Sequence, residues 1–218
     1  MDPRYWLERW RSGNTPFDQP QVNPDLQQYW PSLRLPPSAS VFVPLCGKSV
    51  DMAWLRGRGH GVIGVELSGQ AIAEFYATEG LHSVRRAAGR LECAEAPGYQ
   101  LYVGDLFDLE AEHLVAVRGV YDRGALIALP AEMRARYARH LIKVLPARCS
   151  ILLLTLDYPQ EQMAGPPFAV GGDEVHALYG GEFRITELAT REVSSIEPRY
   201  LERGLRRRSD SVHLLERG

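Results

Sequence analysis

An acidic residue stands where a ribose-binding group is expected in an open parallel sheet. Glu66 ends an apolar stretch at residues 61–67, about twenty positions after Gly47, which lies in a turn following a shorter apolar stretch at 41–43. An acid at this spacing accepts hydrogen bonds from ribose hydroxyls, beyond the carboxyl ends of the strands. The turn carries a single glycine instead of the three that wrap a diphosphate, so the pattern indicates a ligand with ribose and adenine but no diphosphate. S-adenosylmethionine has that chemistry.

Two other glycine patterns imitate nucleotide-binding motifs and fail on context. Residues 47–49 (G-K-S) resemble the end of a P-loop, but Phe42 stands where the motif needs its first glycine. Residues 59–64 (G-H-G-V-I-G) match G-x-G-x-x-G, yet they enter a strand, whereas the dinucleotide fingerprint follows a strand and opens a helix. Neither pattern predicts its usual ligand.

Charged residues follow two further apolar stretches. Asp105 and Leu106 come after residues 99–103, where an acid and an apolar side chain could meet the amino group and ring face of adenine. Aspartate after a strand is also a common turn residue. Arg123 follows residues 119–122 and enters an apolar segment, which indicates either an internal salt bridge or the wall of a pocket.

The elements that must position these residues alternate from residue 40 onward. The strands predicted from apolar stretches are 41–43, 61–67, 99–103, 119–122 and 150–156, and the predicted helices are 50–58, 69–79, 130–145 and 173–179. Strands alternating with helices predict an α/β fold with a doubly wound, mainly parallel sheet, and the continuous hydrophobicity of the strands suits burial on both faces. Alternating strands from residue 183 to the end predict an antiparallel hairpin that closes the sheet.

The first 38 residues differ from the rest in being rich in aromatic residues and interrupted by prolines. A short helix at 5–11 places Trp6 and Trp10 on one face at a four-residue spacing. The segment is too apolar for a solvated tail and too broken for a core element. We therefore predict one domain over residues 1–218, in which residues 1–38 form an N-terminal strap.

Composition narrows the function classes. The 218 residues carry a formal net charge of −2 and are 45% hydrophobic, which indicates a globular chain without a general attraction to nucleic acid or acidic membranes. No apolar stretch is long enough to span a bilayer. The three cysteines form no C-x-x-C pair and the six histidines show no metal-ligand spacing, so we predict no metal site and a reducing, cytoplasmic location.

Five stretches together carry a family resemblance. They are W-L-E-R-W-R-S-G-N-T-P-F (6–17), V-F-V-P-L-C-G-K-S-V-D-M-A-W-L (41–55), G-H-G-V-I-G-V-E-L-S (59–68), D-R-G-A-L (122–126) and G-P-P-F-A-V (165–170). Over essentially its whole length the sequence resembles the thiopurine S-methyltransferases, including their bacterial members. The resemblance implies a class I S-adenosylmethionine-dependent methyltransferase with a Rossmann-like, seven-stranded, mainly parallel sheet and an antiparallel last strand.

The resemblance also implies roles for individual residues. The residues expected at the cofactor are Trp10, Leu45, Gly47, Glu66, Asp105, Leu106 and Arg123. Arg123 and Arg199 are the candidate catalytic residues, since a guanidinium could stabilise an anionic sulfur or relay a proton through water. Phe17, Asp18 and Phe168 are expected on the substrate side, although the family usually has histidine where Asp18 stands. A tryptophan face attracts the cationic sulfonium, so we expect Trp10 and residues 4–30 to form a lid over the cofactor.

The implied activity is methyl transfer to the sulfur of thiopurines or aromatic thiols. Selenium and tellurium species are further candidate acceptors because such anions are soft and polarisable, and we expect a monomer because the sequence carries no signal of an obligate interface. The sequence leaves the natural acceptor open, together with the cis or trans state of the peptide bonds around Pro166 and Pro167. Two alternatives stay open as well. One is a nucleotide-dependent oxidoreductase, which the failed glycine fingerprint disfavours, and the other is a methyltransferase-like fold that binds a ligand without catalysis.

Overall fold

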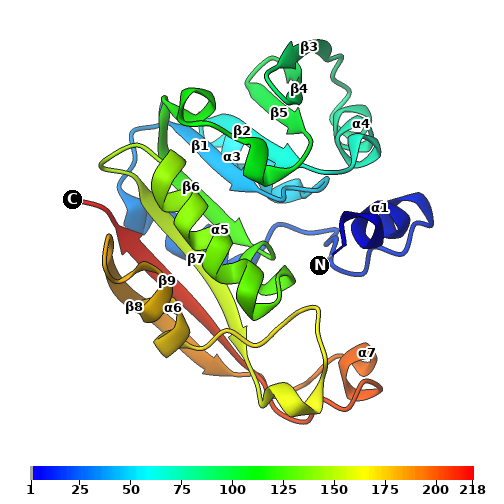
Figure 1. Ribbon diagram of the computed structural model, residues 1–218, viewed down its shortest axis with the longest axis vertical. Helices are drawn as coiled ribbons and strands as arrows, with labels where there is room; N and C mark the ends of the chain where they lie inside the picture. The colour runs from blue at the N-terminus through cyan, green and yellow to red at the C-terminus, as the bar shows by residue number, and fades with distance from the viewer. Residues whose placement is uncertain (1) are drawn as a thin grey trace.

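A nine-stranded sheet organises the chain, with strand order β3-β4-β5-β2-β1-β6-β7-β9-β8. The computed structural model describes residues 2–218 (Figure 1). The strands are β1 (Ser40–Pro44), β2 (Gly61–Glu66), β3 (Val84–Ala88), β4 (Leu91–Ala96), β5 (Tyr99–Val103), β6 (Val117–Arg123), β7 (Ser150–Asp157), β8 (Arg184–Glu192) and β9 (Ser209–Glu216). The central strands β5, β2, β1, β6 and β7 run parallel, whereas β9 pairs antiparallel with both β7 and β8.

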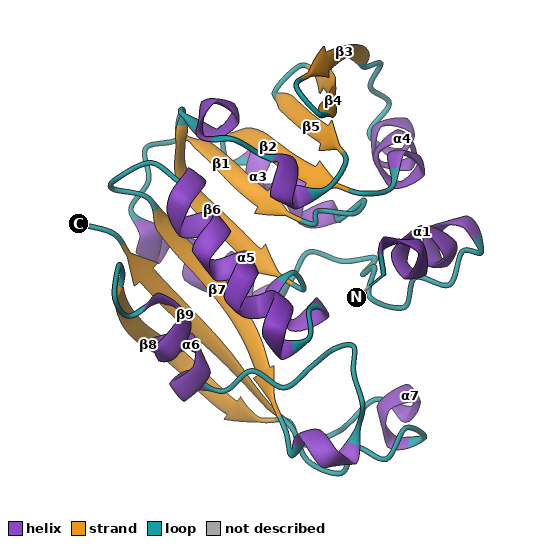
Figure 2. Cartoon of the chain, in the orientation of Figure 1, coloured by secondary structure: helices purple, strands orange, loops and turns teal. Residues whose placement is uncertain are grey.

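Helices cover both faces of this sheet (Figure 2). They are α1 (Pro3–Arg11), α2 (Pro24–Tyr29), α3 (Val50–Gly57), α4 (Gly69–Thr78), α5 (Ala131–Val144), α6 (Gly172–Tyr179) and the short α7 (Pro198–Leu201). Side chains of α5 and α6 share one buried cluster, and side chains of α2, α3 and α4 share the other. Along β1, Phe42 enters the first cluster while Val41 and Val43 enter the second, as the two-residue period of a strand requires.

The predicted α/β class and the antiparallel last strand are confirmed, but the implied count of seven strands is too small. The run β5-β2-β1-β6-β7-β9-β8 supplies the seven, and the hairpin of β3 and β4 extends the sheet by two more. Strand β3 is exposed along nearly its whole length, so its sequence lacks the apolar alternation from which a strand could be predicted. Cross-strand ion pairs from Arg85 to Glu92 and from Arg86 to Glu95 connect the two strands instead.

The strap divides into a part that belongs to the core and a part that does not. Leu26 and Trp30 are buried in the cluster beneath α3 and α4. The Trp30 indole N–H donates to His60 Nε2 at 3.1 Å, and His60 Nδ1 lies 3.1 Å from the Ala39 carbonyl oxygen. Helix α1 lies apart from this core, beside α4 and near the carboxyl ends of the parallel strands (Figure 1).

No helix within residues 2–218 combines the length and the hydrophobicity that a bilayer crossing requires.

Candidate active site

A cavity of about 780 Å³ lies at the carboxyl ends of β1, β2, β5 and β6. One wall comes from these strands and the turns that follow them, and the opposite wall comes from the strap and the segment around α7. Carboxyl ends of parallel strands are the usual ligand-binding edge of such a sheet. The cavity has the size of a typical small-molecule site.

Glu66, at the end of β2, is the buried acid of the strand wall. Its Oε2 accepts a hydrogen bond from the Gly47 amide at 3.0 Å, and its Oε1 accepts one from the Ser68 amide at 2.8 Å. Burial raises the pKa of the carboxyl, and the amides of Ser68 and Gly47 oppose that shift. Each carboxylate oxygen can accept about two hydrogen bonds, so both retain capacity toward the cavity that Glu66 lines.

The turn after β1 brings the backbone of Gly47 against the strap. Leu45 has φ = 46° and Gly47 has φ = 53°, a left-handed conformation that favours glycine and strains leucine. A Cβ atom on Gly47 would lie 3.0 Å from the ring of Trp10. Glycine is therefore required here for its backbone conformation and for the close approach of the indole.

Trp10 is buried, and its surroundings come from three elements. Its ring meets Phe17 edge to face with centroids 5.5 Å apart, and Lys48 Nζ lies 5.9 Å from the ring centroid. The side-chain amide of Gln70 on α4 donates to the Trp10 carbonyl oxygen at 3.3 Å. The tryptophan of α1 thus lies on the glycine turn, at the boundary between the two walls.

Asp105 and Leu106 both line the cavity after β5. Asp105 is exposed and accepts a hydrogen bond from the Phe107 amide at 2.9 Å, which makes it the N-cap of a 3₁₀ turn. Leu106 is buried, with an exposed fraction of 4%. The turn role considered from sequence is therefore observed for Asp105, and it coexists with a position on the cavity wall.

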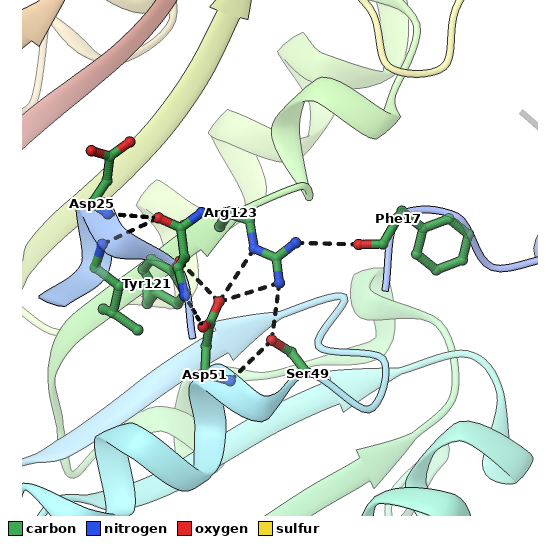
Figure 3. A network of polar contacts seen from close by, with 8 residues as sticks. Phe17, Asp25, Ser49, Asp51, Tyr121 and Arg123 are labelled. Atoms are coloured by element: carbon green, nitrogen blue, oxygen red, sulfur yellow. Dashed lines mark hydrogen bonds and ion pairs between the residues drawn. The ribbon is translucent and has the colours of Figure 1, made fainter. Parts of the chain in front are cut away.

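Arg123, at the end of β6, is both a salt-bridge residue and a cavity residue (Figure 3). Its Nε and Nη2 donate to Asp51 Oδ2 at 3.3 and 3.2 Å, and Nη2 also donates to Ser49 Oγ at 3.0 Å. Its Nη1 donates to the carbonyl oxygen of Phe17 in the strap at 3.3 Å. The two interpretations that the sequence left open are both correct.

Asp51 was not predicted as a site residue. It lies in the first turn of α3, where an acid is commonplace, and nothing in its neighbours along the chain marks it. The structure shows it completely buried, with Tyr121 OH donating to Oδ2 at 3.0 Å. The only available signal was a short acidic side chain in a helix whose first six residues are otherwise apolar.

The wall around α7 carries a second arginine. Arg199 donates through Nη1 to the Pro16 carbonyl oxygen and through Nη2 to Tyr200 OH at 3.3 Å. Its Nε is shielded from solvent and has no hydrogen-bond partner among residues 2–218. Arg203 donates to the carbonyl oxygens of Gly165 and Pro166 at 3.0 and 2.9 Å, which connects α7 to the loop before Phe168.

The three residues expected on the substrate side are placed differently. Phe17 and Asp18 line the cavity, and Asp18 lies 3.6 Å from Lys48 Nζ. Burial raises the pKa of the Asp18 carboxyl, and Lys48 opposes that shift. Phe168 is absent from the cavity wall as the described residues define it, because its ring packs over Gly165. Pro166 and Pro167 line the cavity instead, and the peptide bonds preceding both are cis.

Asp122 points to the other side of the sheet from its neighbour Arg123. It accepts hydrogen bonds from Tyr137 OH at 2.7 Å and from the Leu126 amide at 3.2 Å. Burial raises the pKa of its carboxyl to about 6. The first two residues of D-R-G-A-L therefore have separate tasks, since the acid holds the turn to α5 and the arginine faces the cavity.

The glycine-rich stretch at 59–64 is structural, as predicted. Gly59 follows α3 with φ = 94°, and β2 begins two residues later. A Cβ on Gly64 would lie 2.8 Å from Cys46 Sγ and from Leu101, so this glycine allows close packing inside the sheet. Within residues 2–218, no group of three or more histidine, cysteine or acidic side chains could hold a metal ion.

The strand order and the buried acid at the end of the second parallel strand define a class I methyltransferase. The same fold occurs in solved structures of low sequence identity. A methyltransferase from Anabaena variabilis, described as S-adenosylmethionine-dependent, superposes with a TM-score of 0.66 at 14% identity, covering 100% of this chain and 96% of the other. A 1,6-didemethyltoxoflavin-N1-methyltransferase from Burkholderia thailandensis also gives 0.66, at 15% identity over 99% and 86% of the two chains.

The sequence comparison is more specific than the fold. The model of the thiopurine S-methyltransferase (TPMT) family matches residues 1–218. Proteins named thiopurine S-methyltransferase are 49% identical in Bordetella petrii, over 100% of this chain and 99% of the relative, and 48% identical in Nitrosospira multiformis, over 99% and 98%. The chain belongs to the thiopurine S-methyltransferase family, and its methyl donor is S-adenosylmethionine.

Proposed function

We propose that this protein methylates the sulfur of small aromatic thiols, with thiopurines as the acceptor class. The names of the relatives support the acceptor. The observation that carries the proposal is the side chain of Arg199 on a cavity whose other lining residues include Phe17, Met133 and Pro166. A flat, apolar ring suits those side chains, and a guanidinium N–H favours the thiolate form of a sulfur beside it.

The residues of the strand wall fit S-adenosylmethionine. Glu66 has spare acceptor capacity for two ribose hydroxyls, and Leu45 and Leu106 offer apolar contacts to adenine. Asp105 keeps an oxygen for the adenine amino group, while the Gly47 backbone leaves room for the methionine part. The donor supplies an electrophilic methyl group on a sulfonium, and the buried face of Trp10 suits that cation.

Alignment of the reactants is the main catalytic task for these side chains. An aromatic thiol that is already ionised near neutral pH needs no strong base, only an in-line approach to the methyl carbon. Arg199 is the better candidate for contact with the acceptor, because its Nη1 and Nη2 donate one hydrogen bond each, to Pro16 and Tyr200, and each of these nitrogens carries a second N–H. Arg123 lines the cavity too, but Asp51, Ser49 and Phe17 already accept most of its hydrogen bonds. We therefore propose that it contributes chiefly through the shape of the site.

Selenium and tellurium species are a second acceptor class. Their anions are soft and polarisable, and Arg199 offers them the same guanidinium. Such small anions have no ring to pack against the apolar cavity wall, so we expect them to bind less tightly than thiopurines. We also expect a monomer in a reducing cytoplasm, which the three free, buried cysteines suit.

The test is a methyl-transfer assay with S-adenosylmethionine and a panel of thiopurines, aromatic thiols, selenide and tellurite. We expect turnover with thiopurines and aromatic thiols, and loss of turnover in Glu66→Ala. Calorimetry with S-adenosylhomocysteine and with NAD separates the alternatives. Binding of S-adenosylhomocysteine without any turnover would indicate a non-catalytic fold, and binding of NAD alone would indicate an oxidoreductase.

A further inference from the structure

Asp51 connects three parts of the molecule that are distant in sequence. It lies in the first turn of α3, and its Oδ2 accepts hydrogen bonds from Tyr121 and Arg123 of β6 (Figure 3). Its Oδ1 accepts the backbone amide of Asn23 at 2.8 Å. Asn23 is the last strap residue before α2. A carboxylate with no exposed surface thus bonds the strap directly.

The same carboxylate fixes the direction of the Arg123 side chain. A buried charge is costly unless it is paired and hydrogen-bonded, and this pair has side chains only 1% and 17% exposed. With Nε and Nη2 held by Asp51, the remaining Nη1 donates to the Phe17 carbonyl oxygen. Asp51 therefore reaches the strap a second time, through the guanidinium.

These two attachments bracket residues 17–23, the second part of the connection between α1 and α2. Phe17, at one end, lines the cavity and packs against Trp10. Among the other strap contacts nearby, Arg199 donates to the Pro16 carbonyl oxygen. Lys48 and Asp18 form a weaker anchor, since they are 3.6 Å apart and both partly exposed, and water and salt screen such pairs.

We propose that Asp51 is a positioning residue that holds the strap closed over the cavity, directly through Asn23 and indirectly through Arg123. Its effect on cofactor retention rests on the proposed function, but its effect on the strap does not. When the carboxylate is replaced by a neutral amide, Arg123 is released and the segment carrying Phe17 opens more often.

The experiment measures hydrogen exchange of backbone amides in the full chain, with and without S-adenosylhomocysteine. Asp51→Asn keeps the side-chain shape but places an amide N–H where Arg123 and Tyr121 donate. We expect amides within residues 14–18, such as Asp18, which donates to the Thr15 carbonyl oxygen at 3.0 Å, to exchange about ten- to one-hundred-fold faster. Amides of the central strands should be unchanged.

Arg123→Gln tests the same connection from its more exposed side. It should accelerate exchange over residues 14–18 while leaving the Asn23 amide protected, because Asp51 still accepts that amide. The double variant should add little to Asp51→Asn, since Arg123→Gln removes only the indirect attachment that Asp51→Asn also removes. If Asp51→Asn does not fold, as judged by thermal unfolding, Arg123→Gln alone decides the matter.

Glu174→Gln is the matched control, because it removes the carboxylate of another arginine pair, with Arg134, on the α5 and α6 side. It should leave strap exchange unchanged. Unaltered strap exchange in folded Asp51→Asn, or in Arg123→Gln, overturns the proposal, whatever the turnover of that variant. Failure of the parent protein to bind S-adenosylhomocysteine would instead count against the proposed function, and the strap comparison in the free protein would still be decisive.

Discussion

The two walls of the cavity are built by different means. On the strand wall, Glu66 binds the amides of Gly47 and Ser68, so its position follows from the parallel sheet itself. On the strap wall, the carbonyl oxygens of Pro16 and Phe17 are held by arginines that follow much later in the chain. The first wall is fixed by the fold, and the second is attached to it. Changes in the strand wall should therefore alter what binds, and changes in the strap wall should alter how firmly the site closes.

The largest expected effect is on the strand wall. Glu66→Ala removes the acceptor proposed for the ribose and leaves two buried amides unpaired. Charge-assisted hydrogen bonds contribute about 1.5–3 kcal/mol each, so affinity for S-adenosylhomocysteine should fall by at least about 100-fold. Calorimetry measures this. Glu92→Ala, an exposed acid of the β3–β4 hairpin, is the control, and an affinity of Glu66→Ala close to that of the control would contradict the assignment.

The next effect concerns the dependence of stability on pH. The folded-state pKa of Asp122, about 6, exceeds the ordinary value of 3.8, so the folded protein binds the extra proton between those values. Its contribution to stability is full below about pH 4 and is lost as the pH rises to about 6. Relative to the parent, Asp122→Asn should therefore gain on the order of 1–3 kcal/mol in free energy of unfolding between pH 4 and 7.

Urea unfolding of both proteins at several pH values measures this difference. Asp157→Asn, at the exposed end of β7, serves as the control for removing an acid elsewhere on the sheet. A constant difference between Asp122→Asn and its parent across the range would show that Asp122 titrates normally.

The contrast between the walls also explains what could be predicted from the sequence. Glu66 and Gly47 are marked by strand ends and by a short spacing, both of which are local in sequence. Asp51 depends on partners 28 and 72 positions away, and no local pattern encodes such distances. The β3–β4 hairpin was missed for a related reason, since ion pairs across exposed strands leave no apolar period. Phe168 shares its stretch with the cavity-lining prolines, and only the backbone path decides which of them turn inward.

A smaller effect is expected when Arg199 of the strap wall is replaced and turnover of the methyl acceptor is measured. Arg199→Lys keeps a positive charge that can reach the Pro16 carbonyl oxygen, but it removes the planar fork of the guanidinium. We expect kcat/KM for an aromatic thiol to fall about tenfold, the equivalent of one modest hydrogen bond to a charged group, with cofactor affinity nearly unchanged. Steady-state kinetics across pH measure it. Arg207→Lys, an exposed arginine of the same region, should behave as the parent. An equal loss of cofactor affinity would indicate that Arg199 acts on the cofactor and not on the acceptor.

The smallest effect is expected for Lys48, whose partly exposed ion pairs lie beside the strap. Its replacement tests whether these pairs help to hold the strap electrostatically. Lys48 Nζ lies 2.8 Å from a carboxylate oxygen of Glu74 and 3.6 Å from one of Asp18. The side chains of Lys48 and Glu74 are 30% and 39% exposed. Lys48→Met keeps the packing against Trp10 and removes the charge. Exposed ion pairs contribute about 0.2–1 kcal/mol and are screened by salt, so strap exchange should quicken by less than about fivefold.

The salt response distinguishes this attachment from the buried one at Asp51. In the parent, raising the ionic strength from about 0.05 M to about 0.5 M should quicken strap exchange slightly, and in Lys48→Met that response should shrink. Asp18→Asn, which leaves the bond between Lys48 and Glu74 intact, should show a smaller change than Lys48→Met. A salt response equal in the parent and Lys48→Met would mean that the ion pairs of Lys48 do not help to hold this wall, because screening affects exposed charges far more than buried ones.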